Sequence, residues 1–166
     1  GYASQLAYKR KLDKKMILPL LYPTASFVFL ISLYSEFGVM VLFWLLIIVA
    51  ATDTGAYFAG KTFGRTPFCE TSPNKTLEGV VGGMIFAVIM GIFTSINEVG
   101  ILGAIIVSAI VSLSSVFGDL YESYLKREAG VKDSGNVLPG HGGVLDRVDG
   151  YLFGAIVMLV LLRIII

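Results

Sequence analysis

The sequence predicts an all-α, polytopic membrane protein with about five transmembrane helices and two polar cytoplasmic loops. The chain has 166 residues, of which 55% are apolar and 15% charged, and its mean hydropathy is +0.80. Soluble domains carry about 25% charged residues, so this composition argues against both a soluble globular domain and a disordered protein. The apolar residues gather in segments close to the roughly 20 residues that a helix needs to cross a bilayer. None of these segments alternates apolar and polar residues, which argues against membrane-spanning strands.

Five segments qualify, or nearly qualify, as membrane spans. In chain order they are 16–34, 37–51, 79–96, 99–117 and 148–166. We expect them to form one transmembrane catalytic domain over residues 1–166, with a basic juxtamembrane segment at 1–15. The chain does not begin with methionine and shows no signal-peptide pattern, so we expect it to be part of a longer protein.

The basic residues predict an orientation. Lys and Arg residues precede the first span and lie in the two long connections, whereas the two short connections carry Glu36 and Glu98 and no basic residue. The positive-inside rule therefore places the N-terminus and both long loops in the cytoplasm. Arg163 is the exception, and we expect its side chain to reach the opposite interface.

Charge balance and cysteine content exclude other classes of protein. Thirteen Lys and Arg residues against twelve Asp and Glu residues give a net charge of +1, so no basic field points to nucleic acid. Cys69 is the sole cysteine, which excludes an internal disulfide and a cysteine-based zinc site. The basic segment 1–15 either sets the topology alone or also gathers anionic lipids.

The first polar loop combines a carboxylate, small residues and cations. It begins at Asp53 and ends in a group of Ser72, Lys75 and Thr76 just before the third span. Free backbone amides at a helix N-terminus beside a lysine form an anion site, although the spacing is not that of a Walker loop. The loop therefore predicts phosphate binding, with an ordinary Ser-Pro turn and helix cap as the alternative.

The second polar loop has more carboxylates than cations. Its acidic residues are Asp119, Glu122, Glu128, Asp133, Asp146 and Asp149, and its basic residues are Lys126, Arg127, Lys132 and Arg147. Carboxylates beside cations suit a site where Mg²⁺ bridges polyphosphate oxygens. The alternative is a set of solvated pairs four residues apart, such as Glu122 with Lys126. His141, in a Pro-Gly-His-Gly-Gly run, either contacts a ligand or only makes a local hydrogen bond.

The second loop resembles the signature of the phosphatidate cytidylyltransferase (CDP-diacylglycerol synthase) family. Residues 123–149 fit the pattern Ser-x-apolar-Lys-Arg, four residues, Lys-Asp-x-small, two residues, apolar-Pro-x-His-Gly-Gly-apolar-x-Asp-Arg-apolar-Asp. The first loop is similar to the family's Ser-Pro-Lys-Lys-Thr-x-Glu-Gly block, with Asn74 where a second lysine is common. Residues 53–64 resemble its Asp-x-x-Ala-Tyr-x-x-Gly-x-x-Phe-Gly segment.

The resemblance implies a reaction and a set of site residues. Members of the family transfer CMP from CTP to phosphatidic acid, which releases pyrophosphate and forms CDP-diacylglycerol. By resemblance, Asp119, Asp146 and Asp149 hold Mg²⁺, in a site for one cation or two, and act in catalysis with Lys126 and Arg147. The residues expected to bind substrate are Ser72, Lys75, Thr76, Arg127, Lys132, Asp133, His141 and Asp53.

The resemblance also implies a homodimer, and we expect a bacterial cytoplasmic membrane with the active site facing the cytoplasm. The glycines at the starts of spans three and four could pack between subunits or within one. Two other functions stay open. Another membrane CTP-dependent transferase or lipid-alcohol kinase would carry similar loops, and a transporter would place ionisable groups inside its spans.

Overall fold

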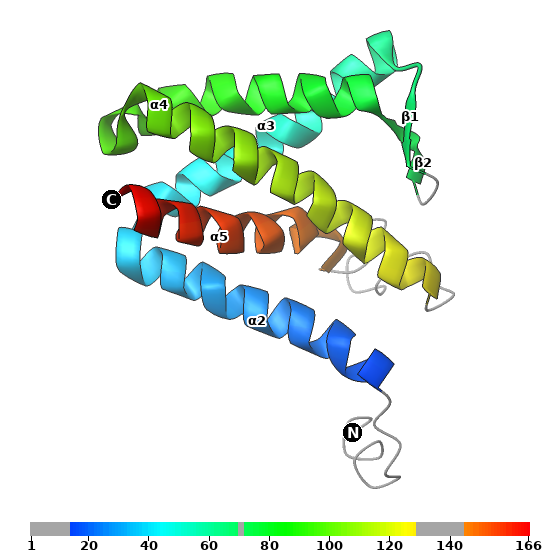
Figure 1. Cartoon of the computed structure of the whole chain (residues 1–166), viewed down its shortest axis with the longest axis horizontal. Helices are drawn as coiled ribbons and strands as arrows, with labels where there is room; N and C mark the ends of the chain where they lie inside the picture. Colours follow the sequence, from blue (N-terminus) through cyan, green and yellow to red (C-terminus); the bar gives the residue numbers. More distant parts are fainter. Residues whose placement is uncertain (1–13, 70–71, 129–144) are drawn as a thin grey trace, which may run out of the picture.

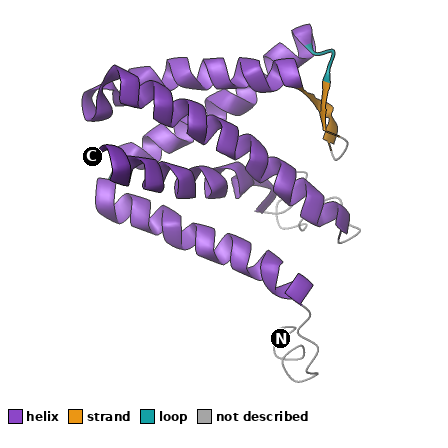
Figure 2. Cartoon of the chain, viewed as in Figure 1, coloured by secondary structure: helices purple, strands orange, loops and turns teal. Residues whose placement is uncertain are grey.

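The computed structural model of the chain describes residues 14–69, 72–128 and 145–166, which form a bundle of helices with one short hairpin (Figures 1 and 2). The elements are α2 (Lys14–Phe37), α3 (Val39–Phe63), β1 (Pro67–Cys69), β2 (Ser72–Thr76), α4 (Leu77–Glu128) and α5 (Leu145–Ile165). The predicted all-α class is confirmed, because in the described residues the two antiparallel strands are confined to the first polar loop.

Helix α4 contains two of the predicted spans, joined by a sharp turn. Its 52 residues include Gly100 with φ of 70° and ψ of 172°, a backbone conformation that glycine adopts far more readily than other residues. The chain reverses direction there, so the two halves of α4 lie side by side (Figure 1). The short connection predicted between spans three and four is therefore confirmed.

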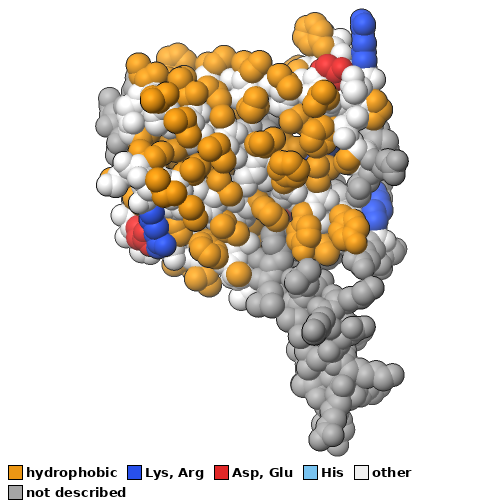
Figure 3. All heavy atoms as spheres, in the orientation of Figure 1, with side chains coloured by type: hydrophobic (Ala, Val, Ile, Leu, Met, Phe, Trp, Pro, Cys, Tyr) orange, Lys and Arg blue, Asp and Glu red, His pale blue; other side chains and the backbone are white. Residues whose placement is uncertain are grey.

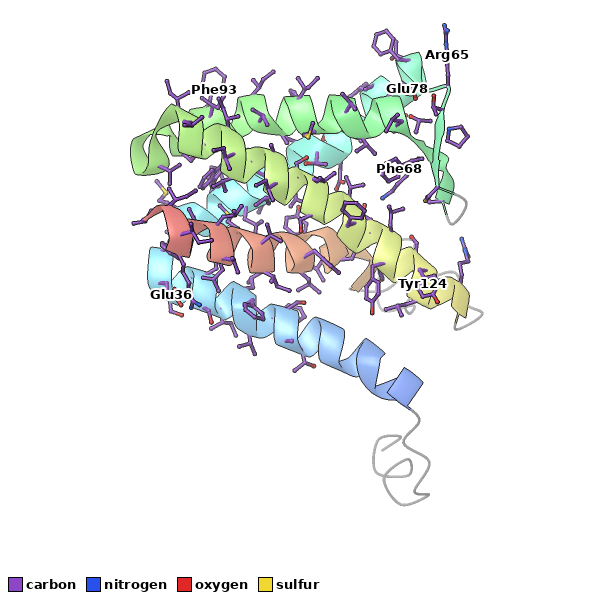
Figure 4. All side chains as sticks on the ribbon, viewed as in Figure 1. Glu36, Arg65, Phe68, Glu78, Phe93 and Tyr124 are labelled. Carbon is purple, nitrogen blue, oxygen red and sulfur yellow. The ribbon has the colours of Figure 1, made fainter. Side chains whose placement is uncertain are left out.

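The outer surface of the bundle is apolar. Four helical segments of the described chain are long and apolar enough to cross a membrane, namely Val39–Phe63, Leu77–Ser95, Val99–Arg127 and Val148–Ile165. Large apolar side chains such as Phe93, which is 79% exposed, point outward (Figure 4), and apolar atoms cover most of the visible face (Figure 3). Such a continuous apolar surface is unfavourable in water, and the chain is an integral membrane protein.

The interior of the bundle is formed mainly by α3, the second half of α4 and α5, with Leu33 from α2 and Ala87 from the first half of α4. Trp44, Ile48, Val107 and Leu159 are among its fully buried residues. The hydroxyl groups of Thr52 and Ser112 lie 2.8 Å apart and form a hydrogen bond between α3 and α4.

Helix α3 and the first half of α4 approach closely because small residues line their interface. A Cβ atom added at Gly83 would lie 2.6 Å from the carbonyl oxygen of Thr52 and 3.1 Å from the Cβ of Ala56. Similar short distances join Gly82 to Ala59 and Gly79 to the carbonyl oxygen of Ala56. Of the two alternatives for these glycines, packing within one chain is therefore the one that the structure contains.

The two ends of the bundle differ in polarity. The hairpin, the end of α4 and the start of α5 lie at one end, and the turn in α4 and the C-terminus lie at the other (Figure 1). Arg163, the exception in the charge pattern, lies at this second end, where its Nε is 2.9 Å from Oε2 of Glu36. This ion pair joins α2 to α5 and gives the guanidinium a partner.

Two helices extend further than the apolar segments predicted. The second span was expected to end at residue 51, but α3 continues to Phe63, and the fourth was expected to end at 117, but α4 continues to Glu128. Apolar composition marks the part of a helix that faces lipid, whereas a helix continues wherever its backbone hydrogen bonds do. The hairpin was not predicted, because strands of 3 and 5 residues are too short to show a periodic pattern.

We expect Gly83→Ala to lower the free energy of unfolding by about 1–3 kcal/mol, because the added methyl group would press on a backbone carbonyl and separate α3 from α4. Thermal unfolding in detergent measures this. Ile85→Ala is the matched control, since Ile85 lies on the same helix, is 54% exposed, and should change stability by about 0.5 kcal/mol or less. Equal unfolding midpoints for Gly83→Ala and the wild type would contradict the close packing.

Candidate functional site

Charged side chains from four elements meet at the hairpin end of the bundle. Nζ of Lys75, on β2, lies 2.9 Å from Oδ2 of Asp119, on α4. The Asp119 carboxylate also interacts with that of Asp149, on α5. Asp53, on α3, is close enough to interact electrostatically with both Asp119 and Lys75. These four residues were each predicted from the sequence, and the structure brings them together.

Asp119 of α4 and Asp149 of α5 face each other because each is adjacent to a glycine. Gly118 precedes Asp119, and Gly150 follows Asp149. A Cβ atom at Gly118 would lie 2.9 Å from the carbonyl oxygen of Asp149, and one at Gly150 would lie 3.2 Å from Oδ1 of Asp119. A larger residue at either position would push the helices apart. Because glycine has no side chain, Gly118 and Gly150 allow the carboxylates of Asp119 and Asp149 to share one site.

Lys75 compensates part of the negative charge in this cluster. Its side chain and that of Asp119 are 30% and 29% exposed, so their ion pair is partly shielded from solvent. Neighbouring carboxylates repel one another and are unfavourable without cations, most of all at the edge of a membrane. The pair therefore both stabilises Asp119 and anchors the hairpin to α4.

The hairpin is also fixed at its junctions with α3 and α4. The carboxylate of Glu78 accepts hydrogen bonds from the backbone amides of Arg65 and Thr66 and from the Thr66 hydroxyl group, the last at 2.8 Å. The hydroxyl oxygen of Thr76 accepts a 3.2 Å hydrogen bond from the Gly79 amide and so caps α4. Thr76 thus forms the helix cap that was the alternative to phosphate binding. Figure 4 shows Glu78 beside the hairpin.

Glu122 is more buried than the solvated pair with Lys126 that was the alternative interpretation of the sequence. Its carboxylate does lie 3.6 Å from Nζ of Lys126, one turn further along α4. However, only 2% of its side chain is exposed, and neither oxygen has a hydrogen-bond partner among the described residues. It also interacts with Asp149. Glu122 is not among the site residues predicted from the sequence, although its spacing of three from Asp119 places both carboxylates on one face of a continuing helix.

A cavity of about 390 Å³ opens beside Lys75, between α3, β2 and α4. Its polar wall is formed by Lys61, Lys75 and Thr76. Its apolar wall includes Ala56, Tyr57, Val80 and Val116. The cavity therefore combines cations with an apolar surface, and it adjoins the carboxylate cluster through Lys75.

The remaining predicted residues are less completely described. Ser72 begins β2, and Lys126 and Arg127 lie in the last turn of α4. Asp146 and Arg147 are in the first turn of α5, but their side chains lie outside the described part of the structure. Lys132, Asp133 and His141 lie outside the described residues altogether. Asp53 lies within α3 and not in a loop, as the first polar loop begins after Phe63.

The carboxylates present fit a magnesium ion by the chemistry of their donors. Mg²⁺ prefers hard oxygen ligands and commonly takes one or two protein carboxylates together with substrate phosphates. Asp119 and Asp149 supply two such carboxylates. Among the described side chains, no group of three or more His, Cys, Asp or Glu residues is placed to hold a metal by itself. The third predicted ligand, Asp146, is not among those side chains.

Comparison with known proteins places the chain among cytidylyltransferases. The model of the cytidylyltransferase family matches residues 7–165. The phosphatidate cytidylyltransferase of Helicobacter pylori strain J99 is 52% identical over 96% of this chain and 61% of its own length. The phosphatidate cytidylyltransferase of Bacillus subtilis strain 168 is 43% identical over 71% of this chain and 45% of its own length. The chain therefore spans less than two thirds of these relatives.

One solved structure supports the fold. It belongs to an intramembrane enzyme for archaeal membrane lipid biosynthesis, with a TM-score of 0.50 and 23% sequence identity. The match covers 70% of this chain and 77% of that chain. At this level of identity, the comparison supports the helical arrangement alone.

We expect Glu78→Ala to loosen the hairpin, because it removes the acceptor that holds residues 65 and 66 against α4. Hydrogen exchange in detergent should show the Thr66 amide exchanging about tenfold faster or more. Arg65→Ala is the matched control, since the Arg65 side chain points away from the bundle (Figure 4) and its backbone amide is retained. Unchanged exchange at Thr66 in Glu78→Ala would show that the strand pairing alone holds the hairpin.

Proposed function

Because this chain belongs to the cytidylyltransferase family, we propose that it forms the catalytic part of an enzyme that transfers CMP from CTP to phosphatidic acid. An oxygen of the lipid phosphate attacks the α-phosphorus of CTP. The bond between the α-phosphorus and the oxygen that bridges to the β-phosphate breaks. CDP-diacylglycerol forms, and pyrophosphate leaves with the electron pair of the broken bond.

The observation that carries this proposal is the contact between the Lys75–Asp119 pair and a cavity that has both a cationic and an apolar wall. The reaction joins a water-soluble triphosphate to a membrane lipid, so its site has to offer charge and apolar surface side by side. At the hairpin end, the charged residues lie next to Val80 and Val116, which are 8% and 6% exposed and belong to the apolar bundle.

The catalytic contribution of the protein is positioning and charge neutralisation. A phosphate monoester is largely ionised at neutral pH, so the attacking oxygen needs no strong general base. Lys75 and Lys126, with Arg147 as predicted from the resemblance, would bind phosphate oxygens and offset the repulsion between the two anionic substrates. Holding the substrates in line lowers the entropic cost of the reaction.

We assign the Mg²⁺ site to Asp119 and Asp149, with Asp146 as the third ligand that the resemblance implies. A bound Mg²⁺ would supply Lewis-acid stabilisation of phosphate charge. The carboxylates of Asp119 and Asp149 hold the negative charge that favours the ion, and Lys75 balances Asp119 from the side of the hairpin. A second cation remains part of this proposal.

The proposal includes a location and an assembly. The relatives from bacteria and the basic loops support a bacterial cytoplasmic membrane with the hairpin end facing the cytoplasm. We also propose a homodimer on the basis of the family resemblance. The glycines of the first half of α4 are occupied by packing within one chain, so a dimer would use other, lipid-facing surfaces.

A radiolabel assay tests the reaction. With α-labelled CTP, phosphatidic acid in mixed micelles and Mg²⁺, we expect label to enter the lipid and pyrophosphate to be released, and we expect EDTA to stop both. Asp119→Asn and Asp149→Asn should each lower turnover about 100-fold or more while the protein remains folded. Glu36→Gln is the matched control, because Glu36 lies at the opposite end of the bundle (Figure 4).

The assay should be run on this chain and on a version extended at its N-terminus to the length of the relatives. Activity in the longer version alone would show that the preceding segment is required. Release of CDP in place of pyrophosphate would identify a kinase. No transfer from either version would refute the proposed reaction.

A further inference from the structure

We propose that Lys61 is a substrate-binding residue that holds, together with Lys75, the phosphate group of the lipid substrate in the 390 Å³ cavity. Lys61 is not among the residues predicted from the sequence to bind substrate. The proposal rests on the proposed function for the identity of the lipid. The anion-binding role of the cavity can be tested without any turnover.

Lys61 contributes to the wall of the cavity. Lys61 lies in the last turn of α3, and its Nζ is 5.6 Å from the centroid of the Tyr57 ring, one turn earlier on the same helix. A cation near the face of an aromatic ring is stabilised by the ring's electrostatic field. Both Lys61 and Tyr57 line the cavity, so the contact between them lies beside it.

Among the described residues, Lys61 has no carboxylate partner, in contrast to Lys75. Lys75 is already paired with Asp119 at 2.9 Å. Within the described parts of the chain, no carboxylate forms a salt bridge with Lys61, whose recorded contact is with Tyr57. Counted over the described residues, the Lys75–Asp119 pair is neutral, and Lys61 gives the polar wall of the cavity a positive charge that an anion would neutralise. A phosphate group placed between the two lysines would receive charge-assisted hydrogen bonds from both.

The apolar wall favours a lipid phosphate over the triphosphate of CTP. Tyr57, Val80 and Val116 belong to three different segments that are apolar enough to cross a membrane. Lys61 lies close to the end of one of these segments, the depth at which lysine side chains reach the headgroup region of a bilayer. A lipid would place its phosphate at the lysines and its glycerol and acyl chains along the apolar wall. Nucleotide phosphates would instead be bound by Lys126 and by the Mg²⁺ that Asp119 and Asp149 are proposed to hold.

Steady-state kinetics of the full-length enzyme separate the two sources of phosphate. We expect Lys61→Met to raise the apparent KM for phosphatidic acid, measured as its surface concentration in mixed micelles, by about tenfold or more. The KM for CTP should change less than about twofold. Lys61→Arg should restore most of the lipid affinity, because it keeps the positive charge at the same position.

Arg65→Met is the matched control for loss of a cation at this end of the bundle. Arg65 follows α3 by two residues, but its side chain points away from the bundle (Figure 4), and it does not line the cavity. We expect its kinetic constants to match those of the wild type. If Arg65→Met raised the KM for phosphatidic acid as much as Lys61→Met does, the loss of any surface cation would explain both results. That outcome would overturn the proposal.

Thermal unfolding in detergent with EDTA and without CTP gives a readout that needs no catalysis. Dioleoyl phosphatidic acid, compared with phosphatidylcholine, should raise the unfolding midpoint of the wild type, Arg65→Met and Lys61→Arg, but not of Lys61→Met. This result would support the lipid site even if no cytidylyl transfer were found. A normal lipid-induced shift in Lys61→Met would overturn the proposal, as would a rise in its KM for CTP alone.

Discussion

The ion pair between Lys75 and Asp119 joins the hairpin to the helical bundle, and the arrangement of the site depends on it. Lys75 comes from a strand outside the apolar bundle, and Asp119 comes from a helix within it. Without the lysine, Asp119 would face the carboxylates of Asp53 and Asp149 with less compensation. The same contact places Thr76 and the cavity next to the aspartates. The contact that neutralises Asp119 is therefore also the contact that positions the hairpin against the bundle.

The charged groups of the bundle lie on helical residues beyond its most apolar segments. Helices α3 and α4 extend past the segments 37–51 and 99–117 predicted from the sequence, and these extensions carry Asp53, Lys61, Asp119 and Lys126. A water-soluble anion and a membrane lipid can meet only where such charged extensions border the apolar bundle. The cavity lies at this border, and its walls reflect it, with lysines on one side and valines on the other. The buried Glu122 adds a further carboxylate beneath the cluster.

Much of the fold followed from composition, because a run of about 20 apolar residues has few alternatives to a membrane-spanning helix. The turn near residue 98 was predicted correctly, and the span predicted from residue 148 lies within α5, which begins at Leu145. Four of the residues predicted for the site, Asp53, Lys75, Asp119 and Asp149, lie near one another. The predicted spans ended at residues 51 and 117, short of the helix ends at Phe63 and Glu128, because hydropathy reports contact with lipid and not backbone hydrogen bonding. The hydrogen bonds that Glu78 accepts from the amides of Arg65 and Thr66 were not predicted, because backbone amides leave no pattern in a sequence.

By itself, the sequence determined that the chain lies in a membrane and that its carboxylates and cations concentrate in two regions outside the most apolar segments. Both follow from the high cost of placing charge in hydrocarbon. Only the tertiary structure decided which of those residues share a site. Lys75 and Asp119 are 44 positions apart, and they meet because the chain reverses at Gly100. Asp119 and Asp149 face each other because Gly118 and Gly150 let two helices approach. Such contacts depend on the shapes of packed surfaces, which no local pattern of residues specifies.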